Sequence, residues 1–332
     1  MRNLIVIGTS AGGISAVKKI LPSLGNTINA SVLMVQHLSR NSDVNAIISI
    51  FQRTTSLHCK VAENGMEIEA GHLYLAPVDH HLMVENEHMI ITQGTQENRY
   101  RPSIDVLFRS AAAAFGNRVI AIILTGMLED GTSGMSAVKR CGGVTIVQDP
   151  DDAQFPSMPI SVMNNMQVDY RSYLENIPLI IHEVLSQPLP PSVAIPKEIE
   201  TEVNITKRMM SDIDALKTIA DHSDFVCPDC GGGLWQIRGE QPNRYRCHTG
   251  HVYTEKLLHD LQDERIEESV WVSIRMLEEK ANLLKVMASR NTDAENGSAK
   301  PQYPRRIEEV EGHINRLKKL LNNLVDNGAD KI

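Results

Sequence analysis

Three polar residues, a serine, a histidine and an aspartate, suggest the chemistry of this chain. Ser10 stands in the pattern G-x-S-x-G, spelled by residues 8–12, and His37 and Asp130 follow later. A serine hydroxyl is a weak nucleophile near neutral pH, so it needs an imidazole that accepts its proton and a carboxylate that orients the imidazole. We therefore expect Ser10 as nucleophile, His37 as general base and acid, and Asp130 as the orienting carboxylate.

Each of these residues also has an ordinary alternative role. A glycine-rich turn between a strand and a helix can bind phosphate, so the turn around Ser10 could serve a nucleotide. A single histidine at a strand end is often structural, and Asp130 before Gly131 could simply cap the next helix. The nucleotide alternative is weakened because His37, and no acidic residue, follows the second predicted strand. The joint placement of the three residues favours a triad.

The elements that must position these residues alternate between strands and helices over residues 1–186. Short runs rich in apolar and β-branched residues indicate buried strands, and helical spacing separates several of them. This alternation predicts an α/β fold, a doubly wound and mainly parallel sheet with helices on both faces. The expected strands are 4–7, 31–36, 72–77, 88–92, 118–124 and 144–147, the expected helices are 14–21, 41–51, 103–115 and 133–139, and 78–87 is expected to be a turn.

The three candidate residues fall at the ends of predicted strands. Ser10 follows the first strand, His37 follows the second, and Asp130 lies just past the strand that ends at Leu124. In parallel sheets the ligand site lies beyond the carboxyl ends of the strands, so we expect the three side chains to meet there. Near the same site, Ser103 is expected as a helix N-cap, with Asp105 as a favourable charge in the first turn.

Longer motifs around these residues resemble the catalytic domain of the chemotaxis protein-glutamate methylesterase (CheB) family. The order Ser, His, Asp differs from the Ser, Asp, His order of the α/β-hydrolases. The resemblance covers residues 1–186 and implies the same triad, with an oxyanion hole near the main-chain N–H groups of Ala11 and Met127. The motifs are Gly8-Thr9-Ser10-Ala11-Gly12-Gly13, Gln36-His37, 101–108 (RPSIDVLF) and 124–131 (LTGMLEDG).

The resemblance also implies a reaction and its partners. That family hydrolyses γ-glutamyl methyl esters on methyl-accepting chemotaxis or sensory proteins, often deamidates selected glutamines, and needs no cofactor for catalysis. Ala11 and Leu128 depart from the family, which usually carries Thr and Gly at these positions. The chemotaxis enzymes carry a receiver module before the catalytic domain. We expect none here, because the first predicted strand starts at residue 4.

A second group of residues has the spacing of metal ligands. Cys227 and Cys230 form a C-x-x-C pair, and Cys247 with His251 follows as C-x-x-x-H. This spacing, with glycines after the first pair, predicts a zinc knuckle in which these four residues hold a structural Zn²⁺. His248 is the alternative fourth ligand. A metal-free or redox-active C-x-x-C is the other alternative, although it leaves the second pair unexplained.

The remaining sequence predicts a linker and a helical extension. Residues 187–204 carry four prolines and are expected as a linker between the catalytic domain (1–186) and a region 205–332 with the knuckle at about 224–253. A short helix is expected within 205–220. Residues 254–290 and 305–325 have amphipathic helical spacing and predict an antiparallel hairpin. The hairpin could pack on the knuckle, form a homodimer or dock on helical receptors.

Bulk properties exclude several function classes. A net charge of -8 over 332 residues argues against nucleic-acid binding through phosphate neutralisation. No apolar run approaches the ~20 residues of a membrane helix, so no membrane insertion is expected. The five cysteines are odd in number, and Cys59 and Cys141 stand alone, which indicates a reducing compartment and hence the cytoplasm. A signalling scaffold that keeps the catalytic fold as a platform is the alternative to an esterase.

Overall fold

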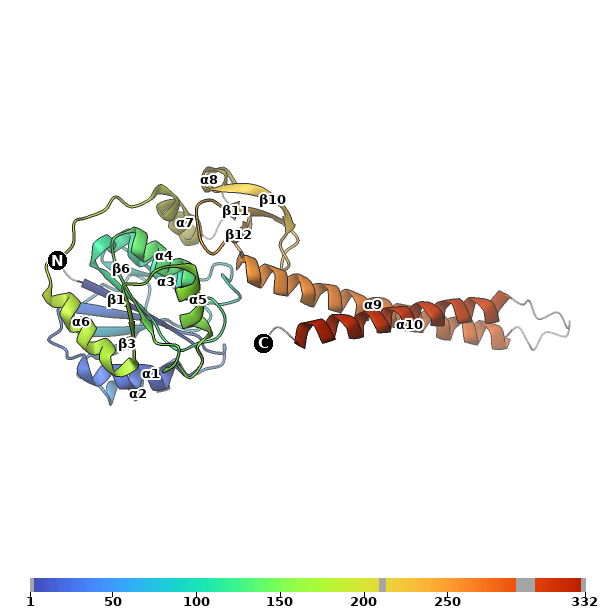
Figure 1. Cartoon of the computed structure of the whole chain (residues 1–332), viewed down its shortest axis with the longest axis horizontal. Helices are drawn as coiled ribbons and strands as arrows, with labels where there is room; N and C mark the ends of the chain where they lie inside the picture. The colour runs from blue at the N-terminus through green and yellow to red at the C-terminus, as the bar shows by residue number, and fades with distance from the viewer. Residues whose placement is uncertain (1–2, 209–212, 291–301, 330–332) are drawn as a thin grey trace. The chain divides into compact units, whose positions relative to one another are not determined.

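The computed structural model describes residues 3–208, 213–290 and 302–329 (Figure 1). The chain divides into two compact units, Met1–Leu257 and Leu258–Ile332. The first unit contains the residues predicted as catalytic domain together with those predicted as knuckle. Within the expected linker, 187–204, the helix α7 (Lys197–Arg208) begins, and its Ile199 and Glu202 are buried.

A seven-stranded sheet forms the centre of the first unit. Its strand order is β3-β4-β2-β1-β7-β8-β9, and every pairing is parallel, which confirms the predicted fold class. β1 lies between β2 and β7, so the strand order reverses beside it. The strands are β1 (Asn3–Thr9), β2 (Ala30–Gln36), β3 (His58–Val61), β4 (His72–Leu75), β7 (Val119–Ile123), β8 (Val144–Gln148) and β9 (Tyr170–Ser172).

Helices cover both faces of this sheet. Leu4 and Val6 of β1 pack into one core cluster, and the alternate residues Ile5 and Ile7 pack into another. Each such buried side chain contributes roughly 1.5–3 kcal/mol to stability. The first cluster lies under α3 (Ile104–Phe115), α4 (Thr132–Arg140) and α5 (Ser157–Asn165), and the second under α1 (Gly13–Ile20), α2 (Val44–Gln52) and α6 (Ile177–Ser186).

One element of the sequence prediction is wrong. The segment 78–87, expected as a turn, contains the strand β5 (His81–Glu85), which pairs antiparallel with β6 (His88–Thr92). His81 looked like a turn residue, but it is fully buried because its Nε2 bonds to the carbonyl of Thr95 and its Nδ1 accepts from the main-chain N–H of Ser103. The strands β3 and β9 and the helices α5 and α6 were not assigned from the sequence.

The predicted knuckle is a small antiparallel sheet. Its strand order is β10-β11-β12-β13, and β11 pairs antiparallel with β12. The helix expected within 205–220 is represented by the end of α7 and by α8, while 209–212 lie outside the described residues. The elements are α8 (Ile213–Ile219), β10 (Ala220–Val226), β11 (Gly233–Ile237), β12 (Arg244–Cys247) and β13 (Val252–Thr254).

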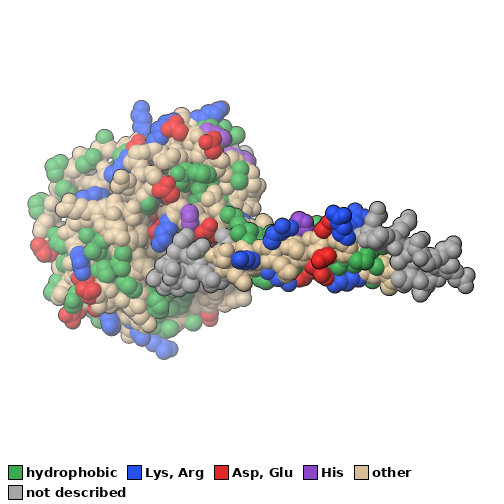
Figure 2. Space-filling model, turned by 45° about the vertical axis from the view of Figure 1, so that its right-hand side comes forward, with side chains coloured by type: hydrophobic (Ala, Val, Ile, Leu, Met, Phe, Trp, Pro, Cys, Tyr) green, Lys and Arg blue, Asp and Glu red, His purple; other side chains and the backbone are tan. Residues whose placement is uncertain are grey.

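The second unit is a helical hairpin. α9 (Glu255–Arg290), which starts at the end of the first unit, pairs with α10 (Gln302–Ala329). Lys285 of α9 pairs with Glu311 of α10 (2.7 Å), whereas Glu278, which comes earlier in α9, pairs with Lys318, which comes later in α10 (2.8 Å). The two helices are therefore antiparallel. Charged side chains of both signs lie along this unit (Figure 2). Among the described helices, none is both long and apolar enough to span a membrane.

Candidate active site and metal-binding cluster

Ser10 lies at the point where the sheet reverses its strand order. The main-chain N–H of Ser10 donates to the carbonyl of Thr125 over 3.1 Å, so the end of β1 is held against the end of β7. Gly12, which caps α1, has φ +76°, a left-handed conformation that favours glycine. The N–H of Gly13 donates to the carbonyl of Ser10 (3.0 Å). The chain therefore turns sharply at Ser10 from strand to helix.

His37 is held beside Ser10 by the neighbouring strand. Its main-chain N–H donates to the carbonyl of Thr9 (3.0 Å), and its ring stacks on the ring of Tyr100 with centroids 3.6 Å apart. The ring Nε2 donates to Oδ2 of Asp130 over 2.9 Å, while the buried Nδ1 has no partner in the described part of the chain. With the proton on Nε2, the lone pair of Nδ1 is the one that can accept a proton.

Asp130 is a buried carboxylate surrounded by hydrogen-bond donors. Although burial raises its pKa, the hydrogen bond from His37 and those from the main chain and Asn98 hold the pKa of Asp130 below its ordinary value. It also lies at the N-terminus of α3, where the helix dipole favours a negative charge. The donors are Nε2 of His37 (2.9 Å), N of Ile104 (2.6 Å), N of Asp105 (3.4 Å), Oγ of Ser103 (2.8 Å) and Nδ2 of Asn98 (3.1 Å).

This arrangement corrects one expectation and answers one alternative. Ser103 occupies the N-cap position of α3, but its hydroxyl donates to Asp130 and makes no capping bond of its own. Asp130 accepts from the first N–H groups of α3 in its place. The N-cap of the following helix α4 is Gly131, so Asp130 does not cap that helix.

The residues expected at the oxyanion hole lie on the two turns that meet at Ser10. A Cβ placed on Gly126 would lie 2.9 Å from Cβ of Ser10, so the chain passes close to the serine just before Met127. Within the described ranges, neither the N–H of Ala11 nor that of Met127 donates a backbone hydrogen bond. Both groups are therefore free to bind an oxyanion, a role that stays a prediction.

The rim of this site is apolar. Met127 is 51% exposed and Leu128 is 45% exposed, although both side chains are large and hydrophobic. Leu128 has φ +66°, in the left-handed region that a non-glycine residue adopts at a cost of about 1–2 kcal/mol. The rim thus includes a strained, exposed leucine two residues after Gly126.

Three residues of the site received no chemical role from the sequence. Asn98 donates to Asp130, Tyr100 covers the ring of His37, and Asp105 accepts from Nδ2 of Asn98 over 2.8 Å. Burial, together with the nearby charge of Asp130, raises the pKa of Asp105 to about 7. Asp105 lies within a recognisable motif, but no local pattern marks Asn98 or Tyr100.

The four predicted metal ligands come together in the first unit. The ligand atoms of Cys227, Cys230, Cys247 and His251 all lie within 4.8 Å of one another. The sulfurs of Cys230 and Cys247 are 3.7 Å apart, and a Zn–S bond of about 2.3 Å in a tetrahedron requires roughly 3.8 Å. Nδ1 of His251 lies 3.5 Å from the sulfur of Cys247. The hydrogen bonds of Cys247 with Cys227 and His251 lower its pKa and favour the thiolate, the form that binds metals.

Glycine turns shape this cluster, and His248 is not part of it. The N–H of Gly231 (φ +70°) donates to the carbonyl of Cys227, and that of Gly250 (φ +113°) donates to the carbonyl of Cys247. The ring of His248 instead packs over Gly232, where an added Cβ would lie 2.5 Å from Cε1. The residue types and distances fit a tetrahedral, closed metal site of three sulfurs and one nitrogen.

Comparison with known proteins connects this geometry to a family. The family described as CheB methylesterase matches residues 5–181. A relative from Leptospira interrogans is 40% identical over 174 residues, which are 52% of this chain and 90% of the relative. The protein-glutamate methylesterase/protein-glutamine glutaminase of Photorhabdus laumondii is 34% identical over 170 residues, which are 50% of this chain and 48% of that enzyme.

A solved structure shows the same fold. The crystal structure of the Thermotoga maritima CheB methylesterase catalytic domain superposes with a TM-score of 0.53 and 31% sequence identity. The match covers 56% of this chain and 98% of that domain. The likeness therefore concerns the parallel sheet with its helices and extends over nearly the whole of the solved domain.

Proposed function

The chain belongs to the CheB methylesterase family, and we propose that it hydrolyses γ-glutamyl methyl esters, and deamidates glutamines, of methyl-accepting chemotaxis or sensory proteins. The observation that carries the proposal is the His37–Asp130 hydrogen bond of 2.9 Å beside the turn of Ser10, at the carboxyl ends of β1 and β2. In this proposal residues 1–186 form the catalytic domain, and residues 187–204 lead to the region that contains the knuckle.

The first half of the proposed reaction forms an ester on the serine. Oγ of Ser10 attacks the γ-carbonyl carbon of the substrate while Nδ1 of His37 takes the hydroxyl proton. Asp130 accepts the hydrogen bond of Nε2–H and stabilises the imidazolium. The N–H groups of Ala11 and Met127 stabilise the oxyanion. The C–O bond to the methoxy group then breaks, and His37 returns the proton so that methanol leaves.

The second half regenerates the enzyme. A water molecule gives a proton to Nδ1 of His37 and attacks the γ-glutamyl ester on Ser10. The bond to Oγ breaks, His37 returns the proton to Ser10, and a glutamate side chain is released. With glutamine as substrate, the same sequence releases ammonia in place of methanol, because both reactions are acyl transfers at the same carbonyl.

We also propose that the cysteine–histidine cluster binds Zn²⁺. Cys227, Cys230, Cys247 and His251 fill all four positions of a tetrahedral ion, so the site has no open position for a substrate and is structural. Metal binding in small modules of this kind contributes about 10 kcal/mol or more and acts as folding energy. The proposed catalytic steps require no metal.

The surface of α9 supports a homodimer formed by the C-terminal helices. Val272, Met276 and Leu283 follow one another at steps of four and seven residues, so they share a helix face, and all three are exposed. A different face of α9, with Ile274 and Leu284, packs against α10. We propose that a second copy of the hairpin covers the exposed face. Light scattering should show a dimer that Met276→Lys with Leu283→Lys converts to monomer, and a wild-type monomer would contradict it.

The cellular location follows from the same proposal. None of the five cysteines forms a disulfide, and Cys59 and Cys141 also lie outside the metal cluster. Free thiols persist in reducing compartments. We propose that the protein works in the cytoplasm on sensory proteins there and does not bind nucleic acid or insert into a membrane.

The test of the esterase is methanol release from receptor membranes that carry labelled methyl esters. Wild type should release methanol, Ser10→Ala should release none above background, and Ser39→Ala should behave as wild type. Ser39 is the matched control because its exposed hydroxyl contacts only Ser42 in the described structure. Equal release by wild type and Ser10→Ala would reject the proposed nucleophile. No release by any variant would favour a scaffold that keeps the fold without this activity.

A further inference from the structure

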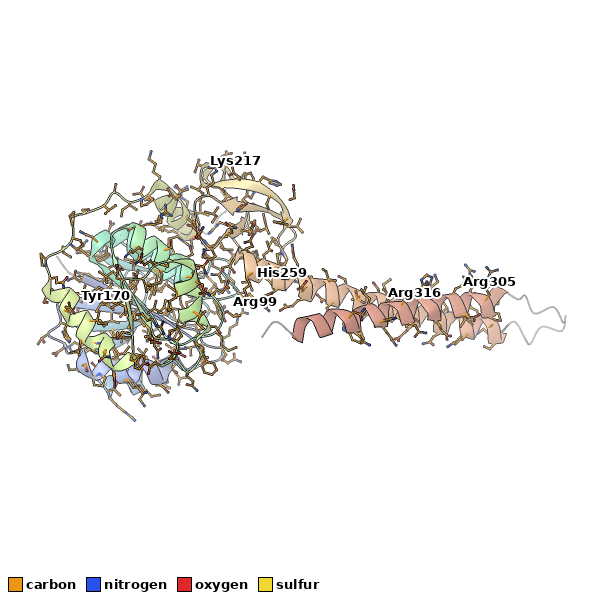
Figure 3. All side chains as sticks on the ribbon, in the orientation of Figure 1. Arg99, Tyr170, Lys217, His259, Arg305 and Arg316 are labelled. Atoms are coloured by element: carbon orange, nitrogen blue, oxygen red, sulfur yellow. The ribbon has the colours of Figure 1, made fainter. Side chains whose placement is uncertain are left out.

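A four-residue turn just before α3 contacts two groups of the proposed triad. The turn Glu97–Tyr100 is closed by main-chain bonds, from N of Tyr100 to O of Glu97 (2.9 Å) and from N of Glu97 to O of Tyr100 (3.3 Å). Asn98 and Arg99 both have positive φ, +52° and +68° (Arg99 is labelled in Figure 3). The backbone of this turn therefore fixes the directions in which Asn98 and Tyr100 point.

Asn98 and Tyr100 each hold one of these groups. Nδ2 of Asn98, whose residue is 3% exposed, donates both to Oδ1 of Asp130 (3.1 Å) and to Oδ2 of Asp105 (2.8 Å). The Tyr100 ring lies parallel to the His37 ring, with an angle of 8° between their planes. The amide thus separates two buried carboxyl groups, and the phenol ring limits the tilt of the imidazole.

The knuckle holds this turn from the other side, through residues next to its metal ligands. The main-chain N–H of Asn98 donates to the carbonyl of Val252 over 2.9 Å, and Val252 directly follows His251. Nη1 of Arg246 donates to Oε1 of Glu97 over 3.2 Å, and Arg246 directly precedes Cys247. Movement of either metal ligand would therefore move a contact of the turn.

A buried network of ion pairs also links the knuckle to the turn Glu97–Tyr100. Three arginines and three glutamates from α3, α7, β12 and their loops meet between the sheet domain and the knuckle. The pairs are Arg109–Glu97 (2.7 Å), Arg109–Glu202 (3.3 Å), Arg244–Glu202 (2.7 Å), Arg244–Glu240 (2.5 Å), Arg246–Glu97 (3.2 Å) and Arg246–Glu202 (3.4 Å). Buried pairs of this kind add little net stability but strongly disfavour any arrangement that separates the charges.

We propose that the knuckle is a metal-dependent clamp on the turn Glu97–Tyr100, and that Asn98 and Tyr100 are positioning residues for Asp130 and His37. Metal binding fixes Cys247 and His251, and with them Arg246 and Val252, which hold the turn. The turn then keeps the carboxylate and the imidazole in their catalytic orientation. The inference rests on the proposed esterase for its effect on turnover, but its effect on the turn is independent of the substrate.

The first test removes the Asn98 amide and leaves the backbone conformation possible. Asn98→Gly suits φ +52°, and its kcat for methanol release should fall roughly 10- to 100-fold with KM within about twofold, because the reacting groups and not the substrate contacts are displaced. Asn86→Gly is the matched control, since Asn86 also has positive φ (+53°) but lies in the exposed β5–β6 turn. Wild-type kcat in Asn98→Gly would overturn the role of Asn98.

The second test follows the turn itself by hydrogen exchange of the zinc-loaded protein. In Cys230→Ser, the main-chain amide of Asn98 should exchange at least tenfold faster, while amides of β1 keep their protection. Cys59→Ser is the control, because Cys59 lies in β3 and outside the cluster. The ¹⁵N signals of the His37 ring should report Nε2–H in wild type and loss of that single tautomer in Cys230→Ser.

The outcomes separate the clamp from the esterase. Faster exchange at Asn98 in Cys230→Ser, without methanol release by wild type, would support the clamp and reject the proposed substrate. Unchanged exchange at Asn98 in a variant that has lost its metal would overturn the clamp, whatever the activity. If Cys230→Ser also loses protection in β1, Arg246→Gln takes its place, because it breaks the ion pair with Glu97 and keeps all four proposed metal ligands. Unchanged exchange at Asn98 in that variant would then overturn the clamp.

Discussion

His37 faces Asp130 with Nε2, at 2.9 Å from Oδ2 of the carboxylate. In the Ser-His-Asp triad of trypsin-like proteases the carboxylate binds Nδ1, and Nε2 faces the serine. The imidazole here has the opposite orientation, so in the proposed reaction Nδ1 acts as the base. Nδ1 lies nearer the main chain of the histidine than Nε2 does, and this suits a serine held close to that main chain by the bond from N of His37 to O of Thr9.

The first prediction concerns the tautomer that Asp130 imposes. In Asp130→Asn, the amide can donate to Nε2 of His37, which would place the proton on Nδ1 and block the base. We expect kcat for methanol release to fall on the order of 10⁴-fold, as for the matching change in a serine protease. The kcat of His37→Gln should fall by a similar factor, and the kcat of the double variant should fall no further. Additive losses in the double variant would show that the two residues do not act as a unit.

The second prediction concerns the strained rim residue. At an ordinary exposed position alanine is more stable than glycine by about 0.4–1 kcal/mol, but at φ +66° the order should reverse. We therefore expect Leu128→Gly to have a free energy of unfolding about 1 kcal/mol higher than Leu128→Ala. Met127 is the matched position, because it is exposed and lies outside the positive-φ region. There the alanine variant should have a higher free energy of unfolding than the glycine variant. Urea unfolding of the four variants measures this, and the same order at both positions would contradict it.

The third prediction concerns pH. The pKa of Asp105 is raised, chiefly by burial, from an ordinary 3.8 to about 7. Between these values the folded protein keeps a proton that the unfolded chain has lost. The contribution of Asp105 to the free energy of unfolding is therefore largest below pH 4 and declines on the order of 1 kcal/mol per pH unit up to about pH 7.

Asp105→Asn should remove this slope, so the stability of wild type relative to Asp105→Asn should fall between pH 5 and pH 7. Urea unfolding at several pH values measures the difference. Asp214→Asn, at an exposed carboxylate, should keep the wild-type curve. Parallel curves for wild type and Asp105→Asn would mean that Asp105 does not titrate in this range.

The fourth prediction distinguishes the two histidines of the knuckle. The purified protein should contain one Zn²⁺ per chain, released when the thiols are modified and measured with a chromogenic chelator. His251→Ala should weaken binding at least tenfold, because it removes a ligand, whereas His248→Ala should keep it. Retained binding in His251→Ala with loss in His248→Ala would assign the fourth ligand to His248.

The sequence predicted the sheet well where strands are apolar and central. β1, β2 and β7 are continuous buried runs, and their ends mark Ser10, His37 and the approach to Asp130. β5 was missed because it begins with His81, which is buried only through partners far away in the sequence. The pattern of apolar residues in a strand predicts which side chains are buried. It does not predict which distant groups will form hydrogen bonds with a polar residue.

The supporting residues of the site could not be predicted for the same reason. Asn98 is one polar residue in a polar loop, and its function depends on Asp130 and Val252, which fold against it from distant segments. The cysteine–histidine cluster, in contrast, could be predicted because the spacing within each of its two pairs is local. Arg244 and Arg246 connect the knuckle to the sheet domain through buried ion pairs. The sequence could not predict this, because alternating arginines in a strand ordinarily face solvent.

The most direct measurement of the central claim is the reaction of the whole protein with a fluorophosphonate, followed by mass spectrometry of its peptides. Such probes react with activated serines and require no knowledge of the substrate. The account predicts a single adduct on Ser10 that forms at least 10³-fold more slowly in His37→Gln. An adduct on another serine would contradict the account. Methanol release that does not depend on Ser10, by a protein in which the probe leaves Ser10 unmodified, would also contradict it.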